Sequence, residues 1–103
     1  MNGNYILDGH TPIEETDLMK WGKWHQTADR VVEKTTVGDV RISTVFLGID
    51  HSFGYGPPLL FETLVFGGDL DQAMERCRTW DKAVEQHQKM VEAVNAAEGT
   101  GND

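Results

Sequence analysis

The chain has 103 residues, 39% of them hydrophobic and 25% charged, which is the composition of one small folded domain and excludes a chain that is disordered throughout. Its formal net charge of −8 excludes broad binding to a nucleic-acid backbone, because that affinity comes from lysine and arginine side chains. No apolar stretch is long enough to cross a bilayer, so no membrane contact is expected.

The first predicted helix follows a turn. Gly9 and Pro12 interrupt regular structure after a short apolar start, and either Thr16 or Asp17 can cap the helix that follows. Residues that recur at helical spacing then predict a helix over residues 17–28: Leu18, Trp21, Trp24, His25 and Ala28. The two tryptophans, three residues apart, are expected in the core or in a subunit interface rather than in a ligand site.

Extended segments predict a sheet after this helix. β-branched residues fill residues 31–37 and 40–49, and the pair Gly38-Asp39 between them predicts a hairpin, because glycine adopts the positive φ of a tight turn. Two further strands are predicted over residues 59–66 and 73–78. Successive short strands joined by turns favour antiparallel pairing.

The last predicted element is an amphipathic helix that Thr79 caps. One apolar stripe follows its length: Trp80, Ala83, Val84, His87, Met90, Val91 and Val94. The elements together predict a single α+β domain over residues 1–95, with an antiparallel sheet of about four strands, an N-terminal helix and a long C-terminal amphipathic helix. Residues 96–103 are predicted to form a flexible tail.

The middle strands are predicted to be apolar on both faces. Residues 45–49 and 59–61 are continuously apolar, whereas a strand with one wet face alternates apolar and polar residues. We expect the two helices to cover one face of the sheet. The second face is left to the N-terminal segment, to the loop before the third strand, or to another copy of the chain, and on this ground we predict a homo-oligomer.

Three motifs carry a resemblance to a known group. They are STVFLGIDH at residues 43–51, PPLLFETLVFGG at residues 57–68 and RTWDKA at residues 78–83, with His87 after them. In this order they resemble a widespread family of small proteins encoded by tailed bacteriophages and prophages. The resemblance implies an accessory phage protein that acts in anti-defence or host takeover, and it carries over no catalytic residue.

The compartment follows from the cysteine content and the N-terminal residues. A single cysteine, Cys77, cannot close an internal disulfide, which fits a reducing environment. The chain starts without the basic and apolar regions of a signal peptide. Together with the resemblance, these features predict a location in the host cytoplasm.

The strongest candidate for a ligand site is the loop over residues 50–58 together with the arginines of the fourth strand. Loops on rigid scaffolds often present binding groups, and two arginines on one face of a strand form a fork for phosphate or carboxylate. Aromatic side chains beside them can stack on a base. The predicted ligand-binding residues are Asp50, His51, Phe53, Tyr55, Arg76, Arg78 and Trp80.

These residues also have a purely structural interpretation. The aromatics of the loop can fold back over the sheet. Glu62 lies in a central strand, where an unpaired carboxylate is costly, so Arg41, Arg76 or Arg78 can serve as its ion-pair partner. The choice between ligand and ion pair stays open for the two arginines of the fourth strand.

No catalytic or metal motif is present in the sequence. It contains no GxSxG elbow, no phosphate-binding P-loop and no HExxH or CxxC spacing, and Asp50 beside His51 lacks a further ligand. His87 lies within the apolar stripe of the last helix and is expected to be a hydrogen-bonded core residue. We therefore predict no enzymatic activity, no metal and no cofactor.

Three hypotheses about function follow. The first is a non-enzymatic phage protein that binds and sequesters a small anionic, nucleotide-like ligand as an oligomer. The second is an acidic protein that inhibits a basic host protein by direct contact, as a mimic of DNA. The third is a minor component of the virion or of its assembly.

Overall fold

A computed structural model describes residues 3–99 of the chain. The two helices are α1 (Leu18–Thr27) and α2 (Trp80–Glu98). The strands are β1 (Tyr5–Asp8), β2 (Thr11–Glu14), β3 (Val31–Val37), β4 (Val40–Phe46), β5 (Phe61–Phe66) and β6 (Met74–Cys77). The predicted α+β fold with its long C-terminal helix is confirmed, and the β1–β2 hairpin is an additional element.

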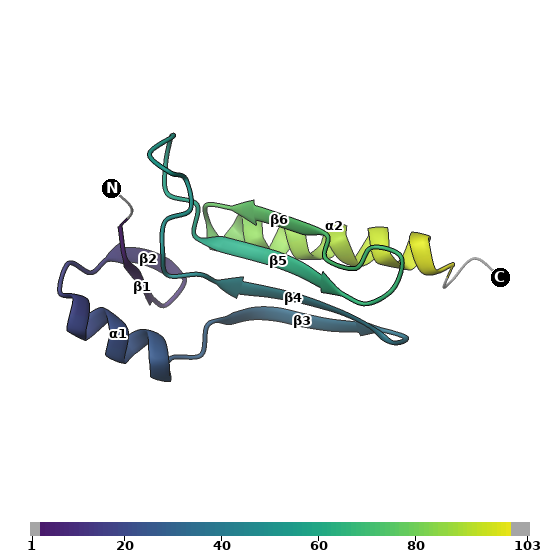
Figure 1. Ribbon diagram of the computed structural model, residues 1–103, viewed down its shortest axis with the longest axis horizontal. Coiled ribbons are helices and arrows are strands. Elements are labelled where there is room, and N and C mark those ends of the chain that lie inside the picture. Colours follow the sequence, from purple (N-terminus) through teal and green to yellow (C-terminus); the bar gives the residue numbers. More distant parts are fainter. Residues whose placement is uncertain (1–2, 100–103) are drawn as a thin grey trace.

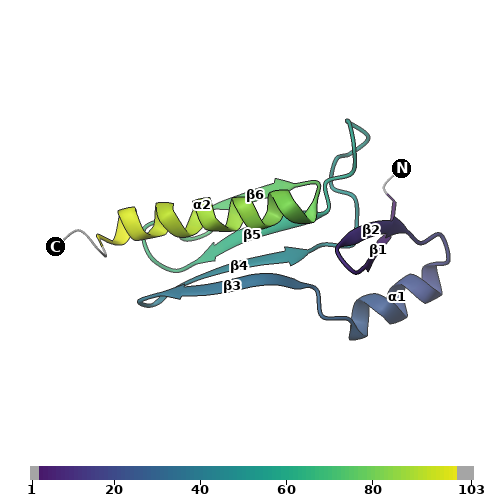
Figure 2. The same cartoon turned by 180° about the vertical axis from the view of Figure 1, so that it is seen from behind.

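The main body of the molecule is a two-layer arrangement. Strands β3 to β6 form an antiparallel sheet in sequence order, and α2 packs across one face of it. In Figure 1 the helix lies behind the sheet, and Figure 2 shows the same helix in front. The predicted hairpin between Val37 and Val40 is confirmed, and Gly38 has the positive φ, 58°, that its turn needs.

The first helix lies elsewhere than predicted. It packs beside β1 at one end of the molecule, buries none of its residues, and leaves Leu18 and Met19 exposed to 65% and 85%. The prediction that both helices cover one face of the sheet is therefore wrong. The reason is that α1 is anchored by Trp21, whose indole N–H donates to the carbonyl oxygens of Tyr5 and Gly48, each at 3.0 Å.

The core lies between α2 and the sheet in two apolar clusters. One contains Val40, Ile42, Val65 and Val94, and the other contains Phe46, Leu60, Phe61 and Ala83. Trp24 of α1 meets Phe46 edge to face, with ring centroids 5.9 Å apart, so the N-terminal elements attach to the second cluster. The resulting molecule is elongated, with extents of 53 × 29 × 20 Å.

The C-terminal helix is longer than predicted. It continues to Glu98, so the predicted domain end at residue 95 is three residues early. Alanine and glutamate are strong helix formers, and Gly99 then ends the helix with a left-handed φ of 71°. The rest of the predicted tail, residues 100–103, lies outside the described residues. Between residues 3 and 99, neither helix combines the length and the apolar character that crossing a membrane requires.

Gly48 holds the N-terminal elements against the sheet. Its φ is +79°, and a Cβ built on it would lie 2.8 Å from the Cδ2 atom of His25. We expect Gly48→Ala to lower the free energy of unfolding by about 2–4 kcal/mol, because backbone strain and overpacking add. Urea unfolding measures this loss. Gly22→Ala is the matched control: Gly22 has open space around it within α1, so alanine there should be neutral or mildly stabilising.

Candidate functional site

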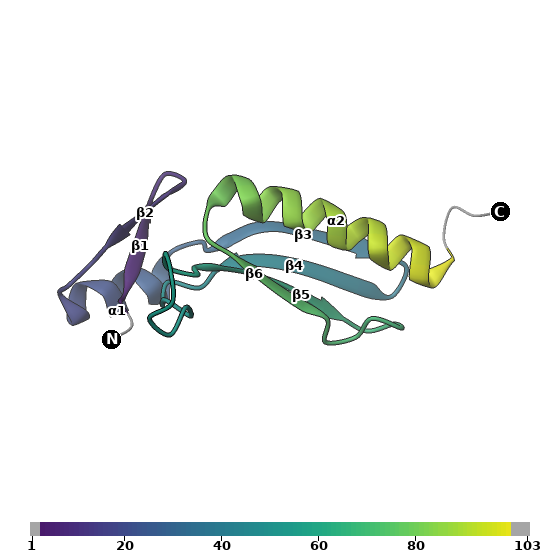
Figure 3. The same cartoon turned by 90° about the horizontal axis from the view of Figure 1, so that it is seen from above.

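The sheet has a second face, which we call the open face. Its side chains point away from α2, and the strand register places them in one grid: Val31, Lys34, Thr36, Arg41, Ser43, Val45, Glu62, Leu64, Phe66, Met74 and Arg76. Figure 3 shows α2 on the opposite side of the sheet. Within residues 3–99, no helix or strand lies over the open face.

Apolar side chains run across the middle of the open face. Val31, Val45, Leu64 and Phe66 are half-buried, and Met74 is 45% exposed. Apolar side chains gathered on a sheet face that no helix covers are typical of a binding surface. The expectation that the helices do not cover this face is confirmed.

The charges on the open face have the sign opposite to that of the whole chain. Lys34, Arg41 and Arg76 stand against one carboxylate, Glu62, so the grid has a net charge of +2. The whole chain has a net charge of −8. The acidic residues are therefore concentrated on other surfaces, and the open face is a local site for negative charge.

Two of these cations are held in place. Arg76 donates from Nε to Oε2 of Glu62 at 3.1 Å, and its Nη2 atom lies 3.1 Å from the same oxygen, which confirms the predicted structural ion pair. Arg41 does not pair with Glu62. Its guanidinium lies over the ring of Phe66, 4.6 Å from the centroid, so its charge stays available to a partner.

The loop over residues 50–58 is organised by Asp50. The carboxylate accepts hydrogen bonds from Ser52 N at 2.7 Å, Ser52 Oγ at 2.9 Å and Leu59 N at 3.0 Å. Burial by itself raises the pKa of Asp50, but these hydrogen bonds outweigh it, and the pKa is lowered. His51 likewise bonds within the loop, through Nδ1 to the carbonyl oxygen of Ile49 at 2.8 Å. Both side chains therefore stabilise the loop.

The aromatic residues of this loop project into solvent. Phe53 is 69% exposed and Tyr55 is 80% exposed, and Phe53 has an unfavourable φ of +56°. The interpretation that these rings fold back over the sheet is wrong, because Gly54 and Gly56, with φ of 87° and 73°, turn the chain outward. The loop extends on the side of the sheet opposite α2, at one end of the open face (Figure 3).

Of the remaining predicted site residues, the two arginines lie near the loop and Trp80 does not. The Nε atom of Arg78 donates to the carbonyl oxygen of Pro57 at 2.8 Å. Arg76 and Arg78 therefore lie where the loop meets the end of β6. Trp80 does not join them. It stacks on His10 with centroids 3.7 Å apart and packs against the second core cluster.

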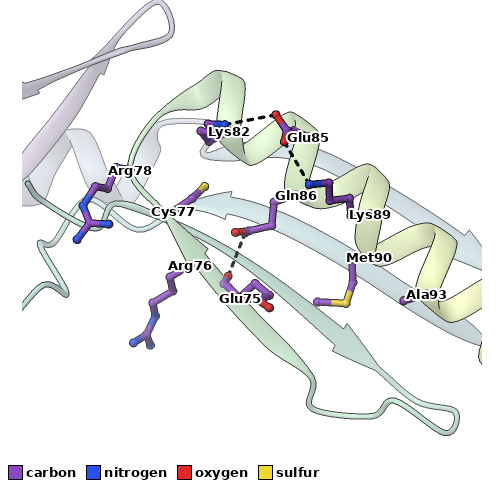
Figure 4. A pocket seen from close by; sticks show the side chains of 10 residues that line it. All are labelled: Glu75, Arg76, Cys77, Arg78, Lys82, Glu85, Gln86, Lys89, Met90 and Ala93. Carbon is purple, nitrogen blue, oxygen red and sulfur yellow. Dashed lines mark hydrogen bonds and ion pairs between the residues drawn. The ribbon is translucent and has the colours of Figure 1, made fainter.

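A groove between β6 and α2 was not predicted from the sequence. It has a volume of about 630 Å³ and is lined by Glu75, Arg76, Cys77, Arg78, Lys82, Glu85, Gln86, Lys89, Met90 and Ala93. Figure 4 shows that Arg76 and Arg78 point away from α2, so they form its outer wall. A second stripe on the helix, at positions 82, 86, 89 and 93, was the sequence signal for this groove.

A polar network crosses the core beneath the sheet. His87, Thr44 and Thr63 are 0% exposed. The Nδ1 atom of His87 lies 2.7 Å from Thr44 Oγ1, which lies 2.6 Å from Thr63 Oγ1, and Gln86 donates to Thr63 Oγ1 at 2.9 Å. A hydroxyl beside an imidazole is the arrangement of a nucleophile and a base, but no substrate reaches these atoms. The prediction of a hydrogen-bonded core histidine is confirmed.

This network predicts a dependence of stability on pH. Burial lowers the pKa of His87 below its ordinary value, and the carboxylate of Glu33, 4.0 Å from Nε2, only partly opposes this. Below about pH 6.5 the unfolded chain therefore binds a proton that the folded chain does not, so the free energy of unfolding should decrease as the pH falls. Urea unfolding at pH 7.5 and 5.5 measures the decrease. It should be smaller in His87→Gln and unchanged in His51→Gln.

Comparisons of the chain with protein-family models, curated proteins and solved structures found no match. The resemblance to small proteins of tailed phages therefore stays a prediction. Among residues 3–99, no group of three or more metal-ligating side chains is close enough to hold an ion. The open face, with the aromatic loop at one corner, is the candidate functional site.

Proposed function

We propose that this protein is a non-enzymatic binding protein that uses the open face to bind an acidic partner protein. The observation that carries the proposal is an uncovered, partly apolar sheet face with a charge of +2 on a chain whose net charge is −8. Phe53 and Tyr55, exposed at one end of this face, have the character of interface anchors.

The shape of the face favours a macromolecule over a small ligand. Small molecules bind in concave pockets, and the groove of about 630 Å³ lies on the α2 side of β6 rather than on the open face. Nucleic acid is less suitable, because the one aromatic ring of the face, Phe66, is already covered by Arg41 and cannot stack on a base.

The charge of the face also argues against a second copy of the chain. In a symmetric dimer each open face would meet an identical one, so two surfaces of net +2 would lie against each other. Like charges in contact are unfavourable. A partner with carboxylates is therefore preferred over the expected homo-oligomer. The role in phage anti-defence or host takeover stays part of this proposal, and its support is the motif resemblance.

A titration followed by amide NMR tests this function. Poly-L-glutamate serves as the probe for acidic protein surface, and ATP and a single-stranded oligonucleotide test the other anions. We expect poly-L-glutamate to shift the amide signals of Lys34, Arg41, Ser43 and Leu64. Shifts confined to α2, or stronger binding of either nucleotide probe at the open face, would contradict the proposal.

A further inference from the structure

The outer edge of β6 is free for pairing with another strand. This strand is the last in the sheet order and, within residues 3–99, pairs only with β5. Val65 N donates to Ala73 O at 3.0 Å and Leu60 N to Cys77 O at 3.0 Å, so the alternate residues 73, 75 and 77 face β5. The backbone N–H and C=O groups of Met74 and Arg76 consequently point outward.

The β6–α2 groove lies along this edge, and Gln86 connects its two sides. The amide of Gln86 donates to Glu75 O at 3.1 Å and to Thr63 Oγ1 at 2.9 Å, which ties α2 to β6. Cys77, Met90 and Ala93 give the groove an apolar side. Burial raises the pKa of the Cys77 thiol, which keeps this side uncharged at neutral pH.

The charges around the groove favour an acidic occupant. Two lysines, Lys82 and Lys89, share the single carboxylate of Glu85 at 3.7 and 3.3 Å. Arg76 and Arg78 stand along the other wall. With Glu75, the lining contains four cations and two carboxylates, and because Arg76 also pairs with Glu62, one positive charge remains in excess.

A second copy of β6 is a poor occupant. Symmetric antiparallel pairing needs outward residues to face each other, so the two-fold axis must pass through residue 74, 75 or 76. An axis at Glu75 or Arg76 would place two like charges directly opposite each other. An axis at Met74 would extend the pairing to Gln72, whose φ of 72° is incompatible with a strand.

We propose that the β6–α2 groove binds an extended peptide that adds to β6 as a fifth strand and alternates apolar and acidic residues. Side chains of an added strand alternate between the two sides. The apolar ones would lie against Met90 and Ala93, and the acidic ones beside Arg76 and Arg78. Arg76 belongs to both surfaces, but Lys34 and Arg41 are not part of the groove, so changes at Lys34 and Arg41 distinguish the open face from this site.

Titration with the peptide acetyl-Val-Glu-Val-Glu-Val-amide, followed by amide NMR, tests the proposal. We expect saturable shifts at β6 and at the groove side of α2. A peptide with N-methylated valines should bind at least tenfold more weakly, because it lacks backbone donors, and a peptide with lysine in place of glutamate should bind at least tenfold more weakly as well.

Two matched variants locate the site. Ala93→Trp fills the groove and should weaken peptide binding at least tenfold, whereas Ala96→Trp, also exposed on α2 but outside the groove, should leave it unchanged. Absence of binding, equal binding of the N-methylated peptide, shifts confined to the open face, or a dimer joined through β6 would each overturn the proposal. Binding by Lys34 and Arg41 is tested separately with poly-L-glutamate, so the two proposals can fail independently.

Discussion

Replacing His87 with leucine is expected to lower the free energy of unfolding by about 2–4 kcal/mol. The imidazole bonds to Thr44 through Nδ1 at 2.7 Å and to Thr35 through Nε2 at 2.8 Å. Leucine removes both bonds, so the half-buried Thr35 hydroxyl loses this partner and Thr44 keeps only its bond to Thr63, and each lost bond costs roughly 1–3 kcal/mol. Urea unfolding followed by tryptophan fluorescence measures the change.

Two further variants show whether the network is responsible. Gln88→Leu, on the exposed side of the same helix, should change stability by less than about 0.5 kcal/mol. Adding Thr44→Val to His87→Leu should cost less than the sum of the two single changes, because each single change removes the same bond between Thr44 and His87. Wild-type stability of His87→Leu, or strict additivity of the pair, would contradict the role given to this network.

Charge reversal on the open face is expected to remove binding of acidic protein. Lys34→Glu combined with Arg41→Glu should weaken binding of poly-L-glutamate at least tenfold, since it replaces two attractive charges with repulsive ones. Fluorescence anisotropy of labelled poly-L-glutamate, at two salt concentrations, measures the loss. Circular dichroism checks that the double variant is folded.

A double variant on α1, outside both proposed binding surfaces, is the control. Lys20→Glu with Lys23→Glu also changes the net charge from −8 to −12, because each reversal removes one positive charge and adds one negative charge. If binding depends on the open face, this control should keep most of the affinity for poly-L-glutamate. Equal losses in the two double variants would show that only total charge matters.

Local structure could be predicted from the sequence because its signals are local. Thr79 caps α2 through a hydrogen bond from Lys82 N to its Oγ1, and Asp17 caps α1 in the same way. The ion pair of Glu62 with Arg76 also followed from sequence, since a carboxylate in a central strand needs a partner on a neighbouring strand. These features depend on residues close in sequence or on adjacent strands.

The placement of elements in space could not be predicted in the same way. The spacing of Trp21 and Trp24 shows that α1 has an apolar side, but it does not show whether that side meets the sheet or the β1–β2 hairpin. The indole of Trp21 decides this by bonding to Gly48 O, a contact across 27 residues of sequence. Strand β2 was not predicted because it contains Pro12, and proline is rare within strands.

The candidate site shows the same limit. Arg76 and Arg78 were predicted on one face of β6 and lie at one corner of the open face. Trp80 was grouped with them because it follows closely in sequence, but the first turn of α2 carries its ring to His10 and the core. Sequence proximity to a strand end does not reveal the direction in which the next helix leaves.

Site-specific photocrosslinking tests the central claim most directly. A benzoylphenylalanine at Ser43, in the middle of the open face, should capture an acidic protein in bacterial cells that express this chain. The same group at Gln88, exposed on α2, should not capture it. Capture of the same protein from both positions, or from Gln88 alone, would show that the open face is not the binding surface.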